Sequence, residues 1–165
     1  MIVMIKVLFV CVHNSARSQM AEAFLNRLGN GKFIAESAGL EPAALNPLAI
    51  KAMNEIGYDI SQSSSNSVLN YFQEGRLYYM VIKVCDQING QRCPIFPQTQ
   101  RVFDWNIEDP AELEGTYEEK LEEVRKIRDD IRAKVELLIS EYEDKADNIR
   151  DWYDISKKTK EKSNE

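Results

Sequence analysis

Residues 5–28 read IKVLFVCVHNSARSQMAEAFLNRL, and this stretch decides the fold. The apolar run from Ile5 to Val10 is typical of a buried β-strand. A polar loop from Cys11 to Arg17 follows it. Beyond the loop, apolar residues recur at helical spacing until Gly29, where a helix can end. A strand, a loop and a helix in this order predict the first unit of an α/β domain.

The rest of the chain repeats this alternation. Apolar and turn patterns predict three more strands at residues 32–38, 77–84 and 101–103, and three more helices at residues 46–56, 68–72 and 116–142. Alternating strands and helices imply parallel crossovers. We therefore expect a single-domain α/β fold, an open parallel four-stranded sheet with helices on both faces. Residues 1–142 would form this domain, and residues 143–165 a C-terminal helical extension or a disordered tail.

Composition excludes several classes of protein. The chain has 165 residues, of which 44% are hydrophobic and 29% are charged, as expected for one globular domain. A net charge of −6 argues against nucleic-acid and anionic-membrane surfaces as partners. The apolar start has neither a basic stretch before it nor a cleavage site after it, so we expect a strand and a cytoplasmic protein. Three cysteines, an odd number, suggest chemistry rather than a disulfide scaffold.

The loop after the first strand has the features of a site for a tetrahedral oxyanion. Backbone N–H groups and the helix dipole converge at such a strand-to-helix turn. The guanidinium of Arg17 can bind two oxygens of the anion, while Cys11 faces it as a nucleophile. The same surroundings favour the Cys11 thiolate, and Ser18 can donate a hydrogen bond to its sulfur. The expected oxyanion-binding residues are Val12, His13, Asn14, Ser15, Ala16 and Arg17.

Each of these residues also has a simpler interpretation. Cys11 can be a small buried residue at a strand end. His13 is the only histidine, and a role in lining the loop is favoured over a Cys–His couple because it lies two residues from Cys11. Asn14 can pin the loop through its side chain, or adopt a positive φ, and these two roles are compatible.

Several motifs in order resemble one known family. They are VLFVCVHNSARSQMAEAFLN at 7–26, ESAGLEP at 36–42, NPLAIKAMNEIGYDIS at 46–61, VIKVCD at 81–86, CPIFP at 93–97 and DWNIEDPAE at 104–112. Together they resemble the low-molecular-weight tyrosine phosphatase superfamily and, within it, the thioredoxin-coupled arsenate reductases. The resemblance implies a phosphatase-like fold and reduction of arsenate to arsenite. It also implies thioredoxin as the external reductant and no tightly bound cofactor.

The resemblance further implies a relay of three thiols. Cys11 would form a covalent adduct with arsenate, Cys85 would attack Cys11 and release arsenite, and Cys93 would attack Cys85. Each exchange needs a thiolate and access to the sulfur. Seven residues separate Cys85 from Cys93, whereas the family usually has six. The simpler alternatives are a buried Cys85 with an incidental Cys93, or a metal-binding pair, although two thiols alone make a weak zinc site.

Two further sets of residues follow from the resemblance. Asp109, before Pro110, would be the general acid or base, although Asp-Pro is also a common turn and Asp104 and Glu108 are nearby alternatives. Some family members hold a structural potassium ion. The matching positions here are Asn14, Glu22, Ser37 and Asn66, and Asn66 stands where the family usually has Asp.

Two other functions remain open from the sequence alone. The chain could be a tyrosine phosphatase that uses Cys11, Arg17 and Asp109, or an anion-binding regulatory module without turnover. The extra cysteine pair favours the reductase, and so does Ala111, where phosphatases of this type carry a tyrosine after Asp-Pro. For all three, we expect an arsenate- or phosphate-type oxyanion as ligand, no nucleic acid or membrane as partner, and a monomer.

Overall fold

The computed structural model describes residues 4–85 and 93–145. Its four strands form one sheet in the order β2-β1-β3-β4, and every neighbouring pair is parallel. The strands are β1 (Ile5–Cys11), β2 (Phe33–Gly39), β3 (Met80–Lys83) and β4 (Arg101–Asp104). The predicted open four-stranded parallel sheet is therefore confirmed.

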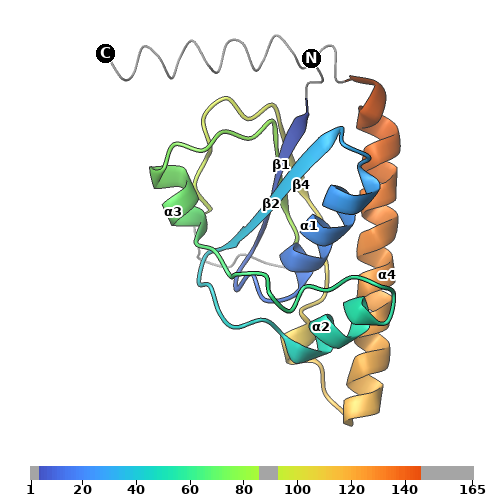
Figure 1. The fold of residues 1–165 in the computed structure, drawn as a ribbon. Helices are drawn as coiled ribbons and strands as arrows, with labels where there is room; N and C mark the ends of the chain where they lie inside the picture. Colours follow the sequence, from blue (N-terminus) through green and yellow to red (C-terminus); the bar gives the residue numbers. More distant parts are fainter. Residues whose placement is uncertain (1–3, 86–92, 146–165) are drawn as a thin grey trace.

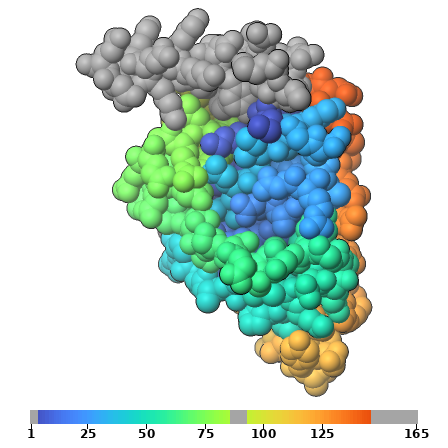
Figure 2. All heavy atoms as spheres, viewed as in Figure 1, coloured from blue at the N-terminus to red at the C-terminus, as the bar shows by residue number. Residues whose placement is uncertain are grey.

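Helices cover both faces of this sheet (Figure 1). The helices are α1 (Arg17–Leu28), α2 (Pro47–Asn54), α3 (Val68–Gln73) and α4 (Tyr117–Tyr142), with short 3-10 turns η1 (Pro110–Glu112) and η2 (Glu143–Lys145). On one face α1 packs against α4 and α2 packs against the same long helix. Figure 2 shows atoms of α1 at the centre of this side of the molecule, with those of α2 below them. α3 and the segment around Phe96 cover the other face.

The central strand β1 divides its side chains between two apolar cores. Ile5, Val7 and Phe9 are fully buried on the side of α1 and α4. Leu8 and Val10 are fully buried on the opposite side. This alternation follows from the two-residue repeat of a strand, and burial on both faces is why the stretch contains hardly any polar residues.

Most element boundaries follow the sequence signals. The side chain of Asn46 caps α2, and the side chain of Thr116 caps α4 by accepting from the Glu119 N–H. The third strand is shorter than predicted, since β3 begins at Met80 rather than at residue 77. Its pairing with β1 nevertheless starts at Tyr79, whose N–H donates to the Lys6 carbonyl. In the part of the chain that the structure describes, none of the helices could span a membrane.

Candidate active site

Residues 11–17, here called the anion loop, are anchored through their carbonyl groups. The carbonyls of Cys11, Val12, His13 and Ser15 accept hydrogen bonds from backbone N–H groups of residues 40–46. In a trans peptide the N–H points opposite to its own C=O. The N–H groups that follow these four carbonyls therefore point away from residues 40–46, toward the inside of the loop. This arrangement forms a concave set of donors, the usual binding site for an oxyanion.

The Cys11 sulfur lies inside this set of donors. Its Sγ accepts from the Asn14 N–H at 2.9 Å and lies 2.9 Å from the Ser18 hydroxyl. The side chain is buried, and it lies next to the amino end of α1, which is not capped by a side chain. The thiol predicted as nucleophile thus lies among hydrogen-bond donors at the amino end of a helix.

Asn14 fixes the shape of the loop from behind. Its backbone has a φ of 50°, and its fully buried amide donates to Ser18 at 2.7 Å and to Ser37 at 2.9 Å. Its amide oxygen accepts from the Asn66 N–H at 2.8 Å. Both roles expected for Asn14, a positive φ and a pinning side chain, occur together. Ser18 is therefore held by Asn14 in position to reach the Cys11 sulfur.

The histidine does not form a couple with the cysteine. The His13 Nδ1 lies 3.0 Å from the Glu41 carbonyl, so the ring binds the neighbouring segment of backbone. This contact agrees with the favoured interpretation of His13 as a residue that lines and supports the loop. The polar groups that contact the Cys11 sulfur are the Ser18 hydroxyl and the Asn14 N–H.

Arg17 and Asp109 meet although 92 positions in the chain separate them. The buried guanidinium donates to the Ile107 carbonyl at 3.0 Å, and its Nη2 lies 3.5 Å from the Asp109 carboxylate. Asp109 also accepts from the Ala111 N–H, which makes it the cap of η1. The turn and the acid-base interpretations of Asp109 are thus compatible. The alternative Asp104 lies on the edge strand β4 and is exposed.

The four positions matched to a potassium site also converge. The Ser37 hydroxyl donates to Glu22 at 3.0 Å and accepts from Asn14, while the Asn66 amide nitrogen donates to the Ser37 carbonyl at 3.3 Å. Burial raises the pKa of Glu22 to about 7. The Ser37 hydrogen bond lowers this pKa, and the charge of Glu36 raises it. The cluster is closed by hydrogen bonds and offers a cation a single carboxylate.

The two later cysteines lie on opposite sides of the sheet. Cys85 follows β3, is buried in the same apolar core as Cys11, and its Sγ lies 3.8 Å from the Val10 carbonyl. Cys93 is half-buried and packs against the other core. All three cysteines are free thiols. The strand order brings Cys85 to the end of β1, whereas Cys93 is held elsewhere.

Three residues of the site were not predicted from the sequence. The amide nitrogen of Gln19 bonds to the Asn14 carbonyl at 3.1 Å and to the Ser64 carbonyl at 2.9 Å. Ile107 contributes only its backbone carbonyl to Arg17, which no sequence pattern reveals. Gly39 approaches the loop so closely that a Cβ there would lie 2.7 Å from the Val12 oxygen. Its place at the end of a strand beside the loop was the one available signal.

Comparisons with known proteins agree with this fold. Residues 6–148 match the family described as low molecular weight phosphotyrosine protein phosphatase. A protein of Synechocystis sp. named "Glutaredoxin arsenate reductase" is 41% identical over 82% of this chain and 96% of its own length. An "Arsenate reductase" of Shouchella clausii is 37% identical over 77% of this chain and 89% of its own length.

Solved structures are similar as well. One described as "An arsenate reductase in the phosphate binding state" superposes with a TM-score of 0.69 at 38% identity, and the match covers 84% of this chain and 98% of the other. The match to the family extends from the first strand through the whole of α4, and it includes the anion loop, Asp109 and all three cysteines. The chain therefore belongs to the low molecular weight phosphotyrosine protein phosphatase family.

Proposed function

We propose that this protein reduces arsenate to arsenite through an adduct on Cys11 and a disulfide relay through Cys85 and Cys93. The observation that carries the proposal is the placement of Cys85. Its sulfur lies against the Val10 carbonyl, at the end of the strand that carries Cys11, and both thiols belong to one apolar core. A hydrolase that resolves its intermediate with water has no need of a second thiol at this place.

In the first step the Cys11 thiolate attacks the arsenic atom of arsenate. A sulfur–arsenic bond forms and one arsenic–oxygen bond breaks, so arsenic stays pentavalent. The leaving oxygen takes a proton from Asp109, which the Arg17 contact holds beside the loop. The loop N–H groups and Arg17 bind the other oxygens of the anion.

In the second step the Cys85 thiolate attacks the Cys11 sulfur. The sulfur–sulfur bond forms, the sulfur–arsenic bond breaks, and its electron pair stays on arsenic, which leaves as trivalent arsenite. Cys93 then attacks the Cys85 sulfur, and Cys11 leaves as a thiolate stabilised by the Asn14 N–H and Ser18. A dithiol reductant, for which we propose thioredoxin, restores both thiols, and the whole cycle takes place in the cytoplasm.

The phosphatase alternative uses the same first step on a phosphate ester. The relatives named as arsenate reductases cover most of this chain at more than a third identity, which supports the reductase. The 3-10 turn η1 begins with Pro110 and continues with Ala111, so the aromatic side chain expected of a tyrosine phosphatase is not at this position. We therefore treat hydrolysis as a side activity of the same thiolate.

The test compares three cysteine variants with thioredoxin, its reductase and NADPH. Cys11→Ser should abolish arsenite formation, because a serine hydroxyl does not ionise near neutral pH. Cys85→Ser should retain the adduct on Cys11 without resolving it. Cys93→Ser should complete one turnover and then accumulate a Cys11–Cys85 disulfide, detected as a mass about 2 Da lower because two hydrogens are lost.

Phosphate-ester hydrolysis provides the control. In the reduced protein it should survive Cys85→Ser and Cys93→Ser, since water resolves a phosphocysteine, and it should be lost in Cys11→Ser. Sustained arsenate turnover by Cys93→Ser with thioredoxin would contradict the three-thiol scheme.

A further inference from the structure

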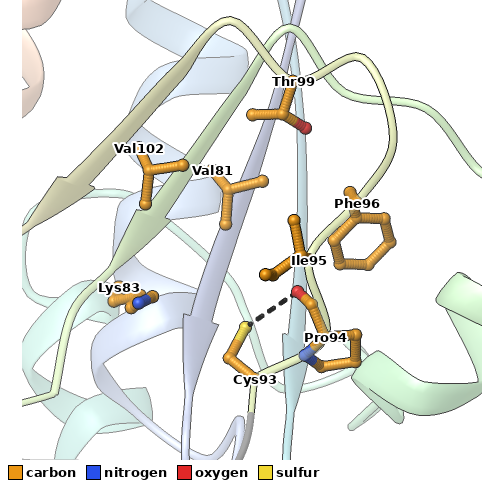
Figure 3. A pocket seen from close by; sticks show the side chains of 8 residues that line it. All are labelled: Val81, Lys83, Cys93, Pro94, Ile95, Phe96, Thr99 and Val102. Carbon is orange, nitrogen blue, oxygen red and sulfur yellow. Dashed lines mark hydrogen bonds between the residues drawn. The ribbon is translucent and has the colours of Figure 1, made fainter.

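The pocket beside Cys93 contains a lysine that the relay has not yet used. The pocket has a volume of about 120 Å³. Its lining residues are Val81, Lys83, Cys93, Pro94, Ile95, Phe96, Thr99 and Val102 (Figure 3). Strand register explains the grouping. Val81 pairs with Val102 and Lys83 with Asp104, so all four side chains are on the same face of β3 and β4. Lys83 is thus the cation of a largely apolar pocket that also contains a thiol.

The surroundings of Cys93 oppose its ionisation. Its Sγ donates to the Pro94 carbonyl at 3.6 Å, and burial raises the pKa of the thiol. The Lys83 ammonium lowers this pKa, and the Asp104 carboxylate raises it further. Lys83 and Asp104 are the charged groups that face Cys93 from the described parts of β3 and β4. Lys83 and Asp104 are cross-strand neighbours with opposite charges and opposite effects on Cys93.

We infer that Lys83 is a positioning residue for the last thiol exchange, in which its ammonium stabilises the Cys93 thiolate in the pocket before this thiolate moves to attack Cys85. This inference rests on the proposed relay. In that step the Cys93 proton goes to solvent, the Cys93–Cys85 bond forms, and the Cys85–Cys11 bond breaks with its electron pair leaving on Cys11. Without the ammonium, a half-buried thiol beside a carboxylate would supply less thiolate at neutral pH.

The test measures Cys93 ionisation directly in the full-length reduced protein. Alkylation by iodoacetamide is followed from pH 6 to pH 10, and the Cys93 peptide is quantified by mass spectrometry. Lys83→Met keeps most of the length of the side chain, being one atom shorter, and removes its charge. It should slow Cys93 alkylation at pH 7 by about three- to tenfold, the effect of an opposite charge at a partly screened distance. Lys83→Arg should restore the rate, and Asp104→Asn should raise it.

Two controls separate this effect from unfolding and from net charge. Lys51→Met removes a charge from the exposed side of α2 and should leave Cys93 alkylation unchanged. The rate of Cys11 alkylation should be the same in Lys83→Met and in the unchanged protein. Cys11 belongs to the core on one face of the sheet, whereas the pocket of Lys83 and Cys93 lies on the other face. Equal Cys93 profiles in Lys83→Met and Lys51→Met would overturn the inference.

A turnover assay makes this failure distinguishable from failure of the relay. Lys83→Met should lower kcat for arsenate with thioredoxin while kcat/KM for arsenate stays the same, since the slowed exchange follows arsenate binding and arsenite release. If the unchanged protein produces no arsenite, the relay fails whatever Lys83 does to Cys93. If it produces arsenite and Lys83→Met matches it in both alkylation and kcat, the inference about Lys83 alone fails.

Discussion

Arg17 connects the anion loop to a segment that follows the last strand. Its guanidinium reaches both the Ile107 carbonyl and Asp109, and the side chain is only 4% exposed. A lysine keeps the charge but has no planar fork, so it cannot make both contacts and also bind two oxygens of an anion. The structural contacts of Arg17 and its proposed role in anion binding thus depend on the same geometry.

We therefore expect Arg17→Lys to weaken phosphate binding and arsenate turnover. The loss of one charged hydrogen bond costs about 1.5–3 kcal/mol, or about 10- to 100-fold in affinity. Calorimetric titration with phosphate measures it. Arg27→Lys, at the far end of the same helix, is the matched control and should bind phosphate normally. Equal phosphate affinities for the two variants would place Arg17 outside the site.

Glu22 should make stability depend on pH. Burial raises its pKa from 4.5 in the unfolded chain to about 7 in the folded protein. The hydrogen bond from Ser37 lowers this pKa, and the charge of Glu36 raises it further. Between these values the folded state binds more protons than the unfolded state, so the free energy of unfolding falls as pH rises. The whole loss is about 3 kcal/mol above pH 7.

The expected result is that Glu22→Gln removes this loss. Urea unfolding of both proteins at pH 5 and pH 8 should show a smaller decrease for the glutamine variant. Repeating the series with KCl in place of NaCl tests the cation expectation, since a bound potassium ion would favour the Glu22 carboxylate and reduce the loss. Parallel pH dependence in the two proteins would mean that Glu22 keeps an ordinary pKa.

At the scale of elements, α4 stabilises the face of the sheet that carries Cys11. Ile131 on this helix is fully buried in the core that contains Cys11 and Cys85, whereas Leu137 is 60% exposed. Ile131→Ala should cost about 2–5 kcal/mol in the free energy of unfolding, through lost burial and the cavity left behind. Leu137→Ala should cost less than about 0.5 kcal/mol. Urea unfolding measures both, and equal costs would show that α4 does not pack as described.

The elements that could be predicted have local signals, and those that could not depend on contacts between distant parts of the chain. The apolar stripe and the capping pair Thr116 and Glu119 predicted α4. Helix caps and apolar helix faces depend on residues that are close together in the sequence. The burial of Cys93 on the far side of the sheet from Cys85 was not predictable. It depends on how Phe96 packs against Tyr78, a contact between rings 5.2 Å apart from separate segments.

At the scale of the whole molecule, the proposed relay requires a thiol from one core to reach a thiol in the other. Cys93 packs with Phe96 in one core, and Cys85 is buried in the other. When the Cys85–Cys93 disulfide forms, Cys93 has to leave its pocket and take part of residues 94–99 with it. The oxidised protein should therefore be less well packed around Tyr78 than the reduced one.

Hydrogen exchange measured by mass spectrometry checks this expectation. Peptides that cover residues 94–99 and Tyr78 should exchange faster after oxidation, while α4 and β1 should keep their protection. Cys93→Ser, which cannot form the last disulfide, serves as the control and should show no faster exchange at residues 94–99 under the same oxidant. Uniform exchange in both redox states would mean that Cys93 already reaches Cys85 without movement.

The strand order also decides which parts of this protein can change in length during evolution. β1 and β3 are hydrogen-bonded neighbours, so a rigid ladder sets the approach of Cys85 to the end of β1. The place of Cys93 follows instead from the packing of its own segment against the other core. A single insertion inside β1 or β3 would shift the pairing and turn one thiol to the wrong side of the sheet.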